Sequence, residues 1–344
     1  MILQATFLSS PQRGFSLIEM MIALVLGLLI IGGASSVFLS NKQSYRTGEA
    51  LSRVQEGSRN AFELIARDIR GTALTGCGNP GRVANVVTNS STTWWANWTN
   101  AVIGYGGTSA ATNPALTEGS ASTNHFAGSD SVVLLGADDV TFSASAAADG
   151  STTTPFVTNE TSGFVVGDVI IACTTGGGAA LQQATIAQIT SVPSTGNYVT
   201  GTTGATPGNC TTGLGYPTNC GTANNFTFPY ASTLISKLKS VSWYLGVNPQ
   251  GTNSLYRMVL FNNAGAAATQ AQEMVRNVTQ FQLRYHITGG TDFVDADTVA
   301  ANWGTVDSIR FTITLQATDT RAGVNATPIT RQTVATVALR NRVN

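Results

Sequence analysis

This chain of 344 residues carries little charge. Only 10% of its residues are Asp, Glu, Lys or Arg, whereas about 25% is usual in a soluble domain. The 18 basic and 18 acidic residues give a net charge of zero. The composition therefore gives no electrostatic signature of binding to nucleic acid or to an anionic membrane surface, and no specific nucleic-acid site is evident.

Residues that commonly carry catalysis or bind metals are also scarce. The chain has two His and four Cys, and no CxxC pair of the kind that zinc sites use. It lacks the sequence motifs of serine hydrolases, zinc peptidases and nucleotide-binding proteins. Asp292, Asp295 and Asp297 lack the spacing and the glycine of an EF-hand, which favours a solvated acidic turn over a calcium site. We predict no catalytic residue, no metal and no cofactor, and a protein that is not an enzyme.

The four cysteines are candidates for disulfides. An even number in an exported chain favours pairing, and four cysteines allow three pairings. Cys210 and Cys220 bracket a short polar loop, so a local bridge between them is reasonable. Cys77, just past a predicted helix, would then pair with Cys173, at the end of a predicted strand. Such a bridge would tie the helix to the sheet.

One long apolar run stands out against this composition. From Phe15 to Asn41 the only charged residue is Glu19. The run is long enough to cross a bilayer as a helix, which takes about 20 residues. A carboxylate inside such a helix is costly and marks a functional site by default, with a partner that must be named. The alternative is a simple membrane anchor whose Glu19 reaches the interface.

A short polar segment ending in Gly14 precedes the run. In an ordinary secretory signal the small residues follow the apolar core, but here the small residue comes first. The string GFSLIE at residues 14–19 resembles the leader junction of type IV prepilins and type II secretion pseudopilins. The resemblance implies cleavage by prepilin peptidase between Gly14 and Phe15 and N-methylation of Phe15. It also implies that Glu19 pairs with the N-terminal amine of a neighbouring subunit.

Beyond the apolar run, the pattern predicts that the same helix continues as an amphipathic helix. Residues at steps of three and four form one apolar stripe, while the other face is charged. Glycines and Pro80 end the pattern, so we expect a helix from Phe15 to about Leu74. The stripe is made by Leu51, Val54, Ser58, Ala61, Ile65 and Ile69.

Residues 76–344 are predicted to form a β-rich head with long polar loops. Alternating apolar and polar residues predict antiparallel sheets with one buried face. Trp94, Trp95 and Trp98 cluster in one loop, where they either fill a small core, which we favour, or form a contact surface for a partner or a sugar. We expect strands at residues 131–135, 168–173, 183–192, 237–245, 255–261, 280–287, 308–316 and 331–340.

These segments divide the chain into four parts. They are a leader at residues 1–14, a transmembrane half of the helix at 15–41, an amphipathic half at 42–75, and a head at 76–344. The predicted fold is α+β and pilin-like, with the long N-terminal helix packed on an antiparallel β-sheet head.

A second resemblance lies in the head. Segments at residues 255–257, 273–278, 281–285, 306–310 and 339–342 are similar to minor pilins of the PilW family, and the positions of Cys77 and Cys173 fit that pattern. The resemblance implies a minor pilin that helps initiate a type IV pilus within a tip or priming complex, for twitching motility, adhesion or DNA uptake. Alternatives are a pseudopilin at the tip of a type II secretion system, and a membrane-anchored binding module.

The resemblance also implies partners and a location. The partners are prepilin peptidase and other minor and major pilins, and any surface ligand is unidentified. The expected location is the inner membrane of a Gram-negative bacterium, with a single span and the head in the periplasm, and then the pilus at the cell surface.

Overall fold

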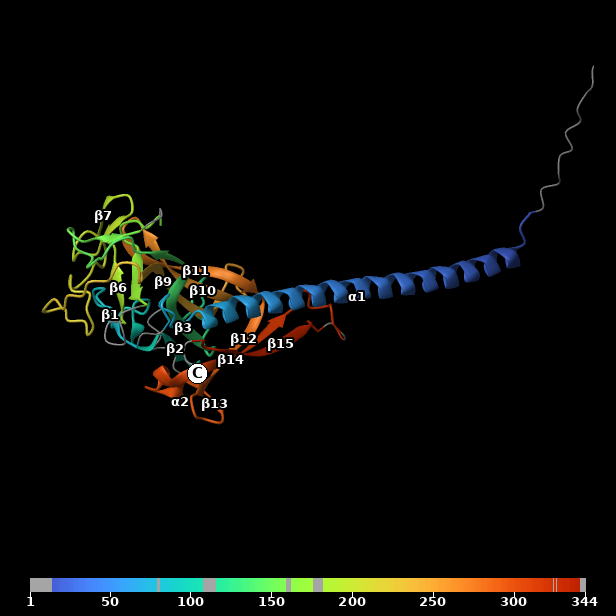
Figure 1. The fold of residues 1–344 in the computed structure, drawn as a ribbon. Coiled ribbons are helices and arrows are strands. Elements are labelled where there is room, and N and C mark those ends of the chain that lie inside the picture. Colours follow the sequence, from blue (N-terminus) through green and yellow to red (C-terminus); the bar gives the residue numbers. More distant parts are fainter. Residues whose placement is uncertain are drawn as a thin grey trace, which may run out of the picture. The chain divides into compact units, whose positions relative to one another are not determined.

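The computed structural model describes residues 14–78, 81–107, 116–158, 162–175, 182–323, 325 and 327–340. Apart from Gly14, the predicted leader lies outside the described residues. The chain forms two units, one made of residues 1–52 with 319–329 and the other of residues 53–318 with 330–344. Figure 1 shows the elements along the chain.

Helix α1 runs from Leu17 to Arg70, so it ends before the predicted limit near Leu74. Gly71 still donates its N–H to a helix carbonyl at 3.1 Å. Ala73 then adopts a positive φ of 61° and donates its N–H to the carbonyl of Leu135 at 2.7 Å. The chain leaves the helix here because its next backbone partner belongs to a strand.

The first unit combines the N-terminal part of α1 with the segment Asp319–Ile329. The Gln43 amide donates to the carbonyl oxygens of Arg321 and Ala322 at 2.9 and 3.2 Å. The Thr47 hydroxyl also donates to the Ala322 carbonyl, and Ala322 is fully buried. These bonds fix the segment on one face of the helix.

In the second unit, the last turns of α1 bury the predicted stripe. Ile65 and Ile69 are fully buried, which contributes about 1.5–3 kcal/mol for each side chain. Phe62 packs against Phe311, with ring centroids 6.1 Å apart. Leu51, predicted to share the stripe, lies in the first unit and is 40% exposed. The confirmed stripe residues are Val54, Ser58, Ala61, Ile65 and Ile69.

The largest sheet has eight strands centred on β9. β9 pairs with β3 along most of its length, with β5 near its start and with β10 near its end. All pairs are antiparallel except β1 with β6, a parallel pair that the sequence pattern did not predict. The strands are β1 (Val83–Asn85), β2 (Val102–Tyr105), β3 (Ser131–Ser143), β5 (Val169–Thr174), β6 (Ala184–Gln188), β9 (Thr233–Val247), β10 (Asn253–Asn263) and β11 (Ala266–Arg276).

Two smaller sheets complete the second unit. One has the order β13-β12-β14-β15 and the other β4-β8-β7. β12 and β14 alternate between buried and exposed or half-buried residues as predicted. The bounds are β4 (Phe156–Val157), β7 (Ser191–Ser194), β8 (Asn197–Val199), β12 (Val278–Ile287), β13 (Phe293–Val294), β14 (Val306–Gln316), β15 (Thr330–Ala338), helix α2 (Ala296–Val299) and the 3-10 turns at Trp98–Asn100 and Trp303–Thr305.

The prediction for β9 was wrong in one respect. The alternation over residues 241–245 predicted one buried and one exposed face, but both faces are buried. The Trp243 indole donates to Asp68 of α1 at 3.0 Å, so the helix covers that face. The Tyr244 hydroxyl donates to the carbonyl of Thr123 at 2.8 Å. A loop therefore covers the second face, and an irregular loop leaves no periodic signal in the sequence.

Candidate functional site

The start of α1 shows how the N-terminal motif is held. The carbonyl of Ser16 accepts the N–H groups of Glu19 and Met20, both at 3.1 Å, and its hydroxyl lies 3.4 Å from the N–H of Glu19. Glu19 stands three residues after this cap, as in a capping box. Its negative charge is also favoured by the helix dipole at this end. The Ser-x-x-Glu spacing is typical of a helix N-cap. The sequence analysis did not predict this capping role for Ser16 and Glu19.

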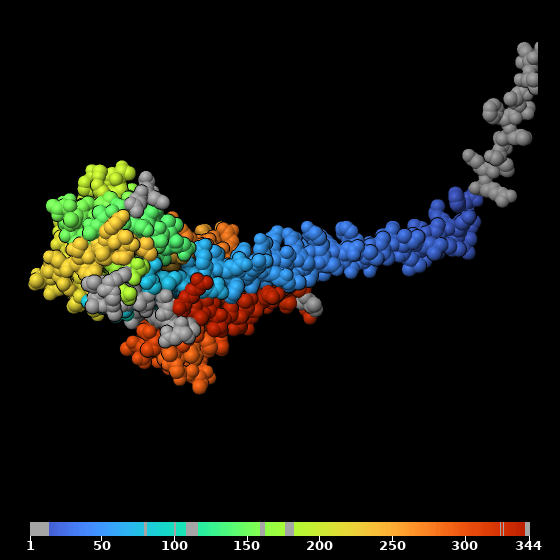
Figure 2. Space-filling view, viewed as in Figure 1, coloured from blue at the N-terminus to red at the C-terminus, as the bar shows by residue number. Residues whose placement is uncertain are grey.

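The first part of α1 presents apolar side chains on all sides. Phe15 is 83% exposed and Ile30 is 72% exposed. Figure 2 shows the dark blue stretch of the helix uncovered. The segment from Leu17 to Leu39 is about 35 Å long, compared with about 30 Å for a bilayer core. The helix is long and apolar enough to cross a membrane.

Glu19 is the charged residue within this stretch. Among the described residues its carboxylate has no ion-pair partner. Phe15 lies just before α1, which begins at Leu17, and Glu19 lies in the first turn of the helix. Glu19 is therefore an acidic side chain near the start of an apolar helix.

Comparison with known families bears on this segment. Residues 9–35 match the model of the prokaryotic N-terminal methylation motif. The motif supports a type IV pilin-like protein, a pilin or a pseudopilin. Neither the curated proteins nor the solved structures contain a match to the chain. The motif with the apolar helix supports membrane anchoring and a pilus, and the motif implies processing by prepilin peptidase and assembly with other pilins.

A buried charge cluster anchors the last turns of α1 to the strands of the second unit. The Asp68 carboxylate is 1% exposed and lies 2.9 Å from the Lys239 ammonium and 2.7 Å from the Arg257 guanidinium. Burial works against the charge of Asp68, but hydrogen bonds and attraction from Arg257 and Lys239 outweigh it and lower its pKa. The sequence analysis did not predict a buried ion pair at Asp68, although its position beside Ile69 of the apolar stripe could have indicated one.

Two disulfides join the four cysteines. Cys77 pairs with Cys173 across a sequence separation of 96, and Cys210 pairs with Cys220 across a separation of 10. This is the pairing that the sequence favoured. The first bridge connects the segment after α1 to strand β5, and the second closes a short loop. No group of three or more His, Cys, Asp or Glu among the described residues could hold a metal ion.

The tryptophan cluster divides between two environments. Trp95 is buried in a core that also holds Ile171 and Ile186, which confirms the preferred core packing for this residue. Trp94 and Trp98 are half-buried and pack against the same core. Trp98 also lines a cavity, so the alternative of a contact surface stays open for its outer side.

Three side chains have the spacing of a hydrolase triad. The Ser129 hydroxyl lies 3.1 Å from Nε2 of His125, whose Nδ1 lies 3.4 Å from Glu118. However, Ser129 and His125 are buried, and the Ser129 hydroxyl donates to the carbonyl of Phe126 at 2.8 Å. Burial lowers the pKa of His125, although Glu118 and Ser129 favour its protonated form. The cluster orders the loop that covers β9, and its serine offers no accessible nucleophile.

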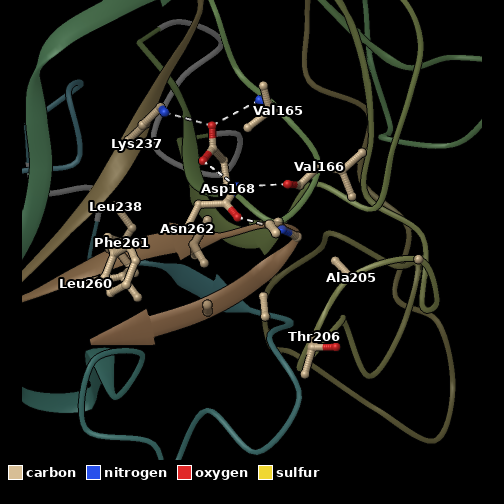
Figure 3. A pocket seen from close by; sticks show the side chains of 17 residues that line it. Val165, Val166, Asp168, Ala205, Thr206, Lys237, Leu238, Leu260, Phe261 and Asn262 are labelled. Atoms are coloured by element: carbon tan, nitrogen blue, oxygen red, sulfur yellow. Dashed lines mark hydrogen bonds and ion pairs between the residues drawn. The ribbon is translucent and has the colours of Figure 1, made fainter. Parts of the chain in front are cut away.

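A cavity of about 1020 Å³ lies beside the β10–β11 hairpin (Figure 3). Three of its polar side chains, Asp168, Lys237 and Asn262, are joined in one network. Asp168 lies 2.8 Å from Lys237 and accepts hydrogen bonds from Asn262 at 2.9 Å and from the Val165 N–H at 3.0 Å. Asn262 in turn donates to the carbonyl of Val166 at 2.8 Å. This network holds the hairpin in place, and its polar side chains already have their partners.

Proposed function

We propose that this protein is a minor pilin that helps to start assembly of a type IV pilus. The observation that carries the proposal is the match of residues 9–35 to the N-terminal methylation motif, which includes the start of the exposed apolar part of α1. The similarity of the head segments to minor pilins of the PilW family supports the narrower assignment. The protein acts by assembling with other subunits, and its partners are other minor pilins and the major pilin.

The mechanism follows from the two charges at the end of α1. Prepilin peptidase cuts between Gly14 and Phe15, which creates a free amine that is then methylated. This amine and the Glu19 carboxylate of an adjacent subunit neutralise each other in the apolar interior of the membrane or filament. The pair sets the axial register of the subunits, because a buried charge without its partner costs about 3–5 kcal/mol.

The parts of the chain take separate roles in this mechanism. Residues 1–14 are the leader, residues 15–41 form the membrane and filament half of the helix, residues 42–75 form the half that carries the head, and residues 76–344 form the head. Before assembly the helix spans the inner membrane once, and the head lies in the periplasm.

The experiment that tests the charge pair is the substitution Glu19→Ala. We expect the variant to be cleaved normally but to enter filaments poorly, measured by immunoblots of sheared pili and by counts of surface pili. Glu63→Ala is the matched control, because Glu63 lies on the exposed face of the same helix. Normal assembly of Glu19→Ala, or an intact residue 14–15 bond in exported protein, contradicts the mechanism.

The second candidate is a pseudopilin at the tip of a type II secretion system. The same motif favours it, because the motif supports pilins and pseudopilins alike. Deletion of the gene separates the two functions. Loss of twitching with normal enzyme secretion supports the pilus, whereas retained exoproteins with normal twitching support the secretion system.

A further inference from the structure

A second cavity lies between the tryptophan segment and the loop closed by the second disulfide. Its volume is about 560 Å³, within the range of about 300–1,000 Å³ that is typical of small-molecule sites. None of its lining residues carries a charge. They are Ala73, Gly81, Val83, Asn85, Ser90, Ser91, Asn97, Trp98, Thr99, Ala101, Tyr216 and Thr218.

The walls of this cavity are held in place from several directions. The Asn85 N–H donates to the Thr218 hydroxyl at 2.8 Å, and the Cys210 N–H donates to the carbonyl of Val86 at 2.8 Å. The Cys210–Cys220 disulfide closes the loop that carries Tyr216. In Figure 1 this yellow loop lies beside β1. A site fixed before its ligand arrives loses less entropy on binding.

Two aromatic rings face this cavity. Tyr216 is 40% exposed, and the Arg82 guanidinium lies 5.6 Å from the centre of its ring. Trp98 is half-buried, so its inner side packs on the core and its outer side is available. Half-exposed aromatic rings in a cavity offer flat apolar surfaces beside polar groups.

The side-chain amides of Asn85 and Asn97 are held by hydrogen bonds and can form further ones. Asn85 accepts the N–H of Val87 at 3.2 Å and donates to a backbone carbonyl. Asn97 accepts the N–H of Thr99 at 3.3 Å and donates to the carbonyl of Ser91 at 3.1 Å. Each side-chain amide has two donor hydrogens and two acceptor lone pairs. Among the described residues, each amide therefore has one donor hydrogen and one acceptor lone pair left for a ligand.

We propose that this cavity binds a neutral carbohydrate. The ring faces of a sugar carry C–H groups that stack on aromatic rings, and its hydroxyls both donate and accept hydrogen bonds. The cavity offers both features in Trp98 and Tyr216 and in the amides and hydroxyls between them. The lining residues carry no charge, and the nearby Arg82 guanidinium lies over the Tyr216 ring. Recognition therefore rests on stacking and on neutral hydrogen bonds, which suits a neutral sugar. The proposal does not depend on the filament role.

The test uses the full-length protein in a detergent without a sugar headgroup. The probes are the neutral oligosaccharides maltotriose, cellotriose, chitotriose, xylotriose and lactose, with sialyllactose as an acidic comparison. Calorimetry measures affinity, and saturation-transfer NMR shows which sugar protons touch the protein. We expect at least one neutral probe to bind and sialyllactose to bind more weakly. Absence of binding by every neutral probe overturns the proposal.

Three variants locate the site. Trp98→Ala and Tyr216→Ala are each expected to weaken binding by about tenfold, because each removes a stacking ring. Tyr216→Phe keeps the ring and should retain most of the affinity. The matched control is Tyr230→Ala, since Tyr230 is 62% exposed and does not line the cavity. Equal affinity of native protein and Tyr216→Ala, or equal losses in Tyr216→Ala and Tyr230→Ala, contradicts the site. Failure here leaves the Glu19→Ala result unaffected.

Discussion

Replacement of Asp68 tests the physical link between helix and head. Asp68 is 1% exposed, and its partners Arg257 and Lys239 are 15% and 19% exposed. Asp68→Asn keeps the shape of the side chain but leaves two largely buried cations without their counter-charge. Breaking a buried ion pair in this way costs about 3–5 kcal/mol. For a domain of this size, that loss lowers the melting temperature by roughly 10 °C.

The assay is urea unfolding of the full-length protein, followed by tryptophan fluorescence. Trp243 donates to Asp68 and reports on the site directly. The matched control is Glu63→Gln, which removes an ion pair of similar separation, 2.8 Å, on the exposed face of α1. Because this pair is exposed to solvent, water screens its charges, and its loss should cost much less stability than the loss of the Asp68 charge. Equal losses in Asp68→Asn and Glu63→Gln would show that burial does not set the strength of the cluster.

The pH dependence provides a second measurement of the same cluster. The pKa of Asp68 is lower in the folded protein than its ordinary value. Its contribution to stability is therefore present above the unfolded pKa and is lost as the pH falls through the folded pKa. We expect Asp68→Asn to lose less stability than the native protein as the solution is acidified. A parallel acid transition in both proteins would refute this reasoning.

Two further predictions concern the second unit. The double substitution Cys77→Ser and Cys173→Ser should lower the unfolding free energy by about 4–5 kcal/mol, whereas removal of the shorter disulfide should lower it by about 3 kcal/mol, because loop entropy grows with the number of residues enclosed. Urea unfolding of both variants measures the difference. An equal loss in the two variants would contradict the entropy argument. Hydrogen bonds to Asp307 and to a backbone carbonyl raise the pKa of His286, so its contribution to stability is complete below the unfolded pKa and is lost as the pH rises through the folded pKa. His286→Gln should flatten the stability profile above the ordinary His pKa of about 6.5, and an unchanged slope would exclude His286 as its source.

Much of the fold followed from local patterns in the sequence. The helix and most of the eight predicted strands could be placed because periodicity of 3.6 or 2 reflects burial of one face. The single strand expected at residues 183–192 was wrong, because β6 ends at Gln188 and Ser191–Ser194 form β7 in another sheet. β12 shows this most clearly, since Phe281, Leu283 and Tyr285 are buried while Gln282 and Arg284 are exposed. The strand β11 was missed because its Ala- and Gln-rich sequence has no apolar alternation.

The sites formed by distant residues could not be predicted in the same way. Arg257 is separated from Asp68 by 189 residues, and no local pattern connects them. The carbohydrate cavity likewise combines Trp98 with Tyr216 from a loop more than a hundred residues later. The N-terminal motif was accessible because all its residues lie within one short segment. Sequence reasoning reached the local sites, and only the tertiary structure could show the others.

The Cys77–Cys173 bridge also decides how a mechanical load would travel. Tension applied along α1 reaches the covalent bond soon after the helix ends at Arg70. The bond passes the load directly to β5, which is hydrogen-bonded to β6 on one edge and β9 on the other. The residues between the two cysteines, Trp98 among them, lie outside this force path. A pulled subunit would therefore keep that stretch folded while its helix and central strands bear the strain.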